Sequence, residues 1–130
     1  MARILVIEDN VVNMKLATRI LESAGHEVLC ASDAREGIAH AQAHRPDAIL
    51  MDIQLPDVDG FEATRRLKND GRTGGIPIVA VTAHAMREDE SRIRSAGCDG
   101  YLSKPYRPAE LLKVVAGVLP RSEHPRSSGV

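Results

Sequence analysis

Residues 4–10 read Ile-Leu-Val-Ile-Glu-Asp-Asn, an aliphatic run that ends in two acids and an amide. The aliphatic part shows no alternation with polar residues, which is typical of a strand that helices cover on both faces of a parallel sheet. Further short apolar runs follow along the chain at residues 28–31, 48–51, 76–81 and 101–102. We therefore predict five strands, most of them buried on both faces.

Segments with the helical period of apolar residues alternate with these runs. The first segment ends at Gly25, a residue type suited to the end of a helix, and has an apolar stripe made of Leu16, Ala17, Ile20, Leu21 and Ala24. Further apolar stripes of the same period predict helices over residues 34–41, 61–67, about 85–96 and 111–119. Pro108 fits the first turn of the last of these helices. Strands joined by helices run parallel with right-handed connections, so the sequence predicts a doubly wound, three-layer α/β fold.

Composition and charge exclude several classes of protein. With 130 residues, 43% of them hydrophobic, we expect one folded domain over residues 1–120 and a flexible tail, rich in Ser, Pro and Arg, over residues 121–130. A net charge of −1, with one Phe, two Tyr and no Trp, argues against direct nucleic-acid binding. The N-terminal apolar run is too short for a signal peptide or a membrane span, so we expect a cytoplasmic protein without a membrane partner. Cys30 and Cys98 have no metal-ligand spacing and are expected to be buried, reduced thiols.

Polar side chains stand where the predicted strands end. Glu8 and Asp9 follow the first run, Asp52 the third and Thr82 the fourth, and Lys104 comes two residues after the last. Ligands of such sheets bind outside the carboxyl ends of the strands. If the first and third strands are neighbours, three carboxylates converge there, and a divalent cation would relieve their repulsion. Oxygen ligands without His or Cys suit Mg²⁺, or Mn²⁺, rather than Zn²⁺.

These side chains together are suited to holding a phosphoryl group. A metal ion and Lys104 would neutralise the phosphoryl oxygens, and Thr82 would donate a hydrogen bond to one of them. Asp52 is then the predicted nucleophile, which forms an acyl phosphate. Taken singly, Glu8 and Asp9 also fit an ordinary helix start, and Asp52 an ordinary acid at a strand end. The combination favours the phosphoryl site.

Four motifs, in this order, resemble those of the response-regulator receiver domains of bacterial two-component signalling. They are Val6–Asn10 (VIEDN), Leu50–Pro56 (LMDIQLP) followed by Asp59-Gly60, Val79–Ala83 (VAVTA) and Leu102–Pro105 (LSKP). The resemblance covers about residues 2–119 and is greatest to single-domain regulators of the cell-cycle type and to receivers of hybrid histidine kinases. It implies a flavodoxin-like (βα)₅ sheet of strand order 2-1-3-4-5, with the site between the first and third strands.

The resemblance also implies the metal and phosphoryl residues. Asp52 matches the phospho-accepting aspartate of the family. Glu8 and Asp9 match the acidic pair that holds Mg²⁺ together with Asp52, and the backbone carbonyl of Gln54 matches a further metal ligand. Lys104 matches the lysine that contacts the phosphate.

Switch residues follow from the same resemblance. Thr82 matches the hydroxyl that moves toward the phosphoryl group, and Tyr101 matches the aromatic residue that then turns inward. The peptide between Lys104 and Pro105 is typically cis in the family. His84 and the side chain of Gln54 match positions at the rim of the site that influence phosphoryl lifetime.

The expected function is a phosphorylation-activated switch rather than an ordinary enzyme. Asp52 would take its phosphoryl group from a phosphohistidine of a histidine kinase or phosphotransfer protein, with Mg²⁺-dependent self-phosphorylation and self-dephosphorylation. With no output domain after it in the sequence, the switch would signal to a downstream protein through the face of the fourth helix, fifth strand and fifth helix, around Tyr101.

Other readings of the sequence remain open. The chain could be a receiver module cut from a hybrid histidine kinase. A Mg²⁺-dependent aspartyl phosphatase would need an Asp-x-Asp motif, whereas Asp52 is followed by Ile53 and Gln54. In a flavodoxin-like FMN carrier, Glu8 and Asp9 would repel the cofactor's phosphate. A pure interaction module would not need the complete acidic set.

Overall fold

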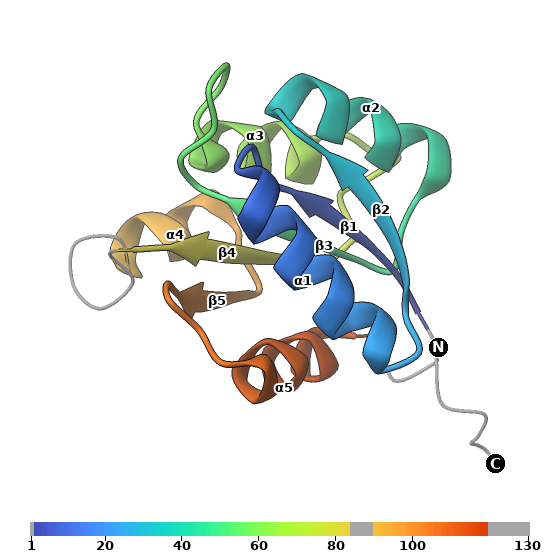
Figure 1. Cartoon of the computed structure of the whole chain (residues 1–130). Helices are drawn as coiled ribbons and strands as arrows, with labels where there is room; N and C mark the ends of the chain where they lie inside the picture. Colours follow the sequence, from blue (N-terminus) through green and yellow to red (C-terminus); the bar gives the residue numbers. More distant parts are fainter. Residues whose placement is uncertain (1, 84–89, 120–130) are drawn as a thin grey trace, which may run out of the picture.

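The structure is a computed structural model that describes residues 2–83 and 90–119. Strands and helices alternate along it (Figure 1), in the order β1 (Arg3–Ile7), α1 (Val11–Ser23), β2 (Glu27–Ala31), α2 (Ala34–His44), β3 (Ala48–Asp52), α3 (Gly60–Asn69), β4 (Ile78–Thr82), α4 (Glu90–Ala96), β5 (Gly100–Ser103) and α5 (Pro108–Val118). His84, the predicted helix start near residue 85 and the predicted tail over residues 121–130 lie outside the described residues.

The five strands form one parallel sheet in the order β2-β1-β3-β4-β5. Ile7 pairs with Met51, Asp52 with Val81 and Thr82 with Ser103, so the strands end at nearly the same level. The predicted fold class and strand order are confirmed. The carboxyl ends of β1, β3, β4 and β5 therefore lie side by side at the C-terminal end of the sheet, which is called its carboxyl edge below.

Helices cover both faces of the sheet. In Figure 1, α1 and α5 lie on one face and α2, α3 and α4 on the other. Because successive side chains of a strand point to opposite faces, β1 sends Ile4 and Val6 to the α1/α5 side and Leu5 and Ile7 to the other. All four of these side chains are at most 1% exposed, which explains the unbroken apolar run.

Several helix boundaries follow from local chemistry. The Asn10 side chain accepts a hydrogen bond from the amide of Asn13 at 2.9 Å and so caps α1. Gly25 has φ +89°, the left-handed conformation that ends the helix as predicted. Pro108 stands in the first turn of α5, where its missing N–H removes no helical hydrogen bond.

Several expectations about burial were wrong. Leu16 and Ala24 belong to the predicted apolar stripe, but Leu16 is 46% exposed and Ala24 is exposed as well, because α1 turns Ala17, Ile20 and Leu21 toward the sheet. Both cysteines were predicted to be buried, but Cys30 is exposed, because β2 is an edge strand, and Cys98 is only partly buried. Within the described residues, no helix is long and apolar enough to cross a membrane.

Candidate functional site

Parallel strands bring three carboxylates to one place. Glu8 and Asp9 follow β1, and Asp52 is the last residue of the adjacent strand β3. Carboxylate oxygens of the three residues lie within 4.8 Å of one another. Glu8 is 7% exposed and Asp52 4% exposed, whereas Asp9 is exposed. The convergence predicted from the strand ends is thus present in the structure.

The negative charge of this cluster is only partly balanced. Burial raises the pKa of Glu8 and the nearby Asp52 carboxylate raises it further, against the lowering effects of the Asn10 amide and of Lys104. The Asn10 amide donates to Glu8 Oε2 at 3.0 Å. Buried acids that repel one another in this way form an oxygen donor set that suits a hard divalent cation.

Lys104 supplies the positive charge of the site. Its Nζ atom lies 3.4 Å from Glu8 Oε1 and 3.4 Å from Asp52 Oδ2, and its side chain is 25% exposed. The Lys104 amide donates to the Thr82 carbonyl at 2.9 Å, which fixes the start of the loop after β5. The peptide between Lys104 and Pro105 is cis, as the family resemblance implied.

The two predicted switch residues lie at different depths. Thr82, the last residue of β4, is 2% exposed at the same edge of the sheet as Asp52. Tyr101 lies in β5, paired with Ala80 of β4, and its side chain is 43% exposed. The structure therefore brings Thr82 close to the carboxylate edge and leaves Tyr101 on the surface.

Gln54 and Gly60 belong to the segment that leaves β3. The Gln54 amide donates to Asp52 Oδ1 at 3.1 Å, while the Gln54 residue itself is exposed. A Cβ atom on Gly60 would lie 2.7 Å from the carbonyl oxygen of Asp52 and 2.6 Å from Cα of Ile53. Glycine is therefore required where α3 begins against the end of β3.

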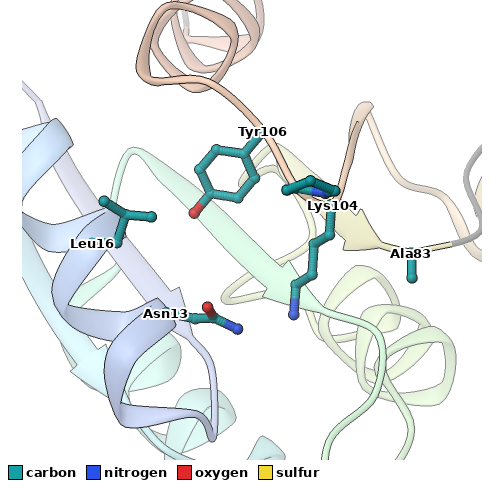
Figure 2. Close-up of a pocket in the computed structure, with 6 residues that line it drawn as sticks. Asn13, Leu16, Ala83, Lys104 and Tyr106 are labelled. Atoms are coloured by element: carbon teal, nitrogen blue, oxygen red, sulfur yellow. The ribbon is translucent and has the colours of Figure 1, made fainter.

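Tyr106 is a site residue that the sequence reasoning missed. It lines a pocket of about 400 Å³ beside the carboxylates, together with Asn13, Leu16, Ala83, Lys104 and Pro105. Figure 2 shows its hydroxyl directed toward α1. Burial raises the pKa of the Tyr106 hydroxyl, and the charges of Glu8 and Asp52 raise it further. Its place directly after the Lys-Pro motif was the available signal.

Comparison with known proteins gives a consistent set of relatives. The sequence model of the response regulator receiver domain matches residues 4–116. The chain is 44% identical over 116 residues to the polar-differentiation response regulator DivK of Brucella anthropi, a match that covers 89% of this chain and 94% of that protein.

Two solved structures extend the comparison. The chemotaxis protein CheY4 of Vibrio cholerae is 33% identical with a TM-score of 0.87, over 92% of this chain and 99% of that chain. The receiver domain of the sensor histidine kinase PA1611 of Pseudomonas aeruginosa is 37% identical with a TM-score of 0.84, over 90% of this chain and 96% of that chain. That receiver domain was solved with a magnesium ion coordinated in its active-site cleft.

Proposed function

Because the chain belongs to the response regulator receiver domain family, we propose that Asp52 is the residue that accepts a phosphoryl group in its signalling cycle. A receiver domain is a phosphorylation-activated signalling switch and interacts with histidine kinases or phosphotransfer proteins and with downstream targets. The finer proposal is that the donor is a phosphohistidine of such a partner. The observation that carries the assignment of Asp52 is its position, buried at the end of β3 between two acids and an ammonium group.

The transfer itself needs one nucleophile and one leaving group. A carboxylate oxygen of Asp52 forms a bond to phosphorus while the P–N bond of the phosphohistidine breaks. The electron pair of that bond returns to the imidazole nitrogen, which takes up a proton. The protein has little further covalent chemistry to do, so positioning of the reactants and neutralisation of charge determine the rate of transfer.

The carboxylates fit a magnesium ion. Glu8, Asp9 and Asp52 would hold it with their side chains, and Gln54 with its backbone carbonyl. Mn²⁺ prefers the same hard oxygen ligands. When bound, the ion supplies positive charge next to the phosphoryl oxygens. The raised pKa of Glu8, caused first by burial and then by the charge of Asp52, supports the assignment, because a bound cation would stabilise the ionised carboxylate.

Lys104 and Thr82 would recognise the phosphoryl group. The Lys104 ammonium, already 3.4 Å from Asp52, is placed to bind a phosphoryl oxygen. The Thr82 hydroxyl would donate to another oxygen and move toward it, which makes room for Tyr101 to turn inward. We also include self-phosphorylation from small phosphodonors and slow self-dephosphorylation in this proposal.

The receiver would contact its downstream protein through the face formed by α4, β5 and α5. Tyr101 is exposed there, and residues of β5 and α5 line an open groove of about 520 Å³. We propose this face for the downstream protein, with residues 1–120 acting as one receiver unit in the cytoplasm and without direct nucleic-acid or membrane contact. The aspartyl phosphatase is not favoured, since the receiver domain model matches residues 4–116. The hybrid-kinase fragment is not favoured either, because the identity to DivK, 44% over 94% of that protein, is higher than the 37% identity to the PA1611 receiver.

A labelling experiment tests the assignment of Asp52. Wild-type protein, Asp52→Asn and the control Asp47→Asn are incubated with acetyl phosphate and Mg²⁺, and their intact masses are measured. Asp47 precedes the same strand but accepts the Arg3 amide at 2.8 Å, far from the site. We expect one base-labile phosphoryl group on the wild type and the control and none on Asp52→Asn. Full labelling of Asp52→Asn would contradict the proposal.

A further inference from the structure

The segment of residues 53–59 joins the phosphoacceptor strand to α3 and carries Gln54. Its first residue is fixed by two backbone bonds, from the Ile53 amide to the Val81 carbonyl at 3.1 Å and from the Gly60 amide to the Ile53 carbonyl at 2.8 Å. Its last residue, Asp59, accepts a bond from the Glu62 amide at 3.0 Å and so caps α3. In the middle of the segment, Leu55 and Val58 are partly buried against the core, whereas Gln54, Pro56 and Asp57 are exposed.

Asp57 provides a contact from this segment to α2. Its Oδ1 atom accepts a hydrogen bond from the Ala34 amide at 2.9 Å, and its Oδ2 atom accepts one from the Arg35 amide at 3.0 Å. Amides in the first turn of a helix have no partner within the helix, so a carboxylate is a favourable acceptor for them. Burial raises the pKa of Asp57, but the bonds from Ala34, Arg35 and nearby amides outweigh it and leave the pKa below its ordinary value.

The α2 helix has a cap of its own. Asp33 accepts a bond from the Glu36 amide at 2.8 Å. Asp57 comes from a position more than twenty residues later in the sequence and adds two further bonds to the same turn. These two bonds therefore constrain the segment after β3 as much as they stabilise α2.

We infer that Asp57 is a positioning residue for the metal site, a role that rests on the proposed function. It fixes the middle of the segment on α2 and thereby sets where the Gln54 carbonyl lies relative to Asp52. Pro56 stands between Gln54 and Asp57, and its ring restricts the backbone of the short stretch that links them. The constraint at Asp57 thus reaches Gln54 through a stiff connection.

The test compares Asp57→Ala with the matched control Asp33→Ala. Each variant removes one carboxylate that accepts hydrogen bonds from amides of the first turn of α2, but only Asp57→Ala removes a contact between α2 and the segment that carries Gln54. We expect the dissociation constant of Mg²⁺, followed by NMR titration, to rise about 10-fold in Asp57→Ala, as for other residues that orient a metal ligand. It should stay unchanged in Asp33→Ala. Asp57→Asn keeps one acceptor oxygen and should give an intermediate value.

A second measurement needs no metal. Hydrogen exchange at the amides of Ala34 and Arg35 should be faster in metal-free Asp57→Ala than in the wild type, because both amides lose their acceptor. Equal Mg²⁺ affinity of Asp57→Ala and Asp33→Ala would overturn the positioning role and leave Asp57 as a helix cap. A wild type that does not bind Mg²⁺ would instead refute the proposed function. If Asp57→Ala does not fold, Asp57→Asn carries the same comparison.

Discussion

The Nζ atom of Lys104 lies 3.4 Å from Oδ2 of Asp52, although β4 separates the strand that ends in Asp52 from the strand that precedes Lys104. The lysine side chain therefore reaches along the carboxyl edge of the sheet, past the end of β4. A phosphoryl group on Asp52 would meet this ammonium group without a large movement of the backbone.

Replacing Lys104 by Met should slow phosphorylation of Asp52 from acetyl phosphate by at least about 10-fold, because one preorganised positive group is lost. The matched control is Lys68→Met. Lys68 is 20% exposed, pairs with Asp99 at 2.8 Å and lies away from the site. Both variants should lose about 1–3 kcal/mol of unfolding free energy, since each removes an ammonium group that pairs with carboxylates. Equal labelling rates for the two variants, measured by mass spectrometry, would remove Lys104 from the mechanism.

Magnesium should stabilise the folded protein. At a Mg²⁺ concentration ten times the dissociation constant, the free energy of unfolding should rise by about 1.4 kcal/mol relative to EDTA, because only the folded state brings the carboxylates together. Asp9→Ala should abolish this increment in urea unfolding curves. Asp99→Ala removes an acid far from the site and should be less stable but keep the increment. An increment that survives in Asp9→Ala would place the ion elsewhere.

Tyr101 should become buried when a phosphoryl mimic occupies the site. Addition of beryllofluoride and Mg²⁺ should shift the NMR signals of the Tyr101 ring, which is 43% exposed in the structure. Thr82→Ala should bind the mimic without this shift, because it lacks the hydroxyl, whereas Thr82→Ser should retain it. An unchanged Tyr101 environment in the wild type would refute the coupling between the two residues.

The two cysteines should differ in reactivity. Burial raises the pKa of the Cys98 thiol above its ordinary value, and the nearby Asp99 charge adds to the effect. Since the thiolate is the reactive form, Cys98 should react slowly with a disulfide reagent at pH 8 and faster as pH rises. Cys30 is exposed and should react first. Cys30→Ser should remove the fast phase; two phases that persist in this variant would contradict the assignment.

The sequence predicted the fold and the carboxylate site because both depend on local patterns. Continuous apolar runs identified the strands, and the acids and the hydroxyl at their ends identified the edge at which the site forms. Once β1 and β3 are adjacent, Glu8 and Asp52 must lie together. The adjacency of β1 and β3 itself was implied by the resemblance to receiver domains and not by these local patterns.

Contacts between distant segments were not predictable in this way. The bonds of Asp57 to α2 join residues more than twenty positions apart, and nothing in the sequence around Asp57 indicates them. Arg92 of α4 is exposed, and its guanidinium carbon lies 4.3 Å from the centre of the Phe61 ring of α3, a contact that the sequence around neither residue indicates. The exposure of Cys30 likewise depends on β2 being an outer strand of the sheet, and the composition of a single strand does not indicate its place in the sheet.

The direction of the strands has a practical consequence for handling this protein. β1 starts at the sheet edge opposite to the carboxylates (Figure 1), and α5 returns to that same edge, where Val118 lies next to Gly100 at the start of β5. A fluorescent reporter fused before Ala2, or a tether to a sensor surface joined after Leu119, would therefore attach on the side away from Asp52. Histidine kinases could then be titrated over an immobilised receiver with its phosphorylation site open to solution.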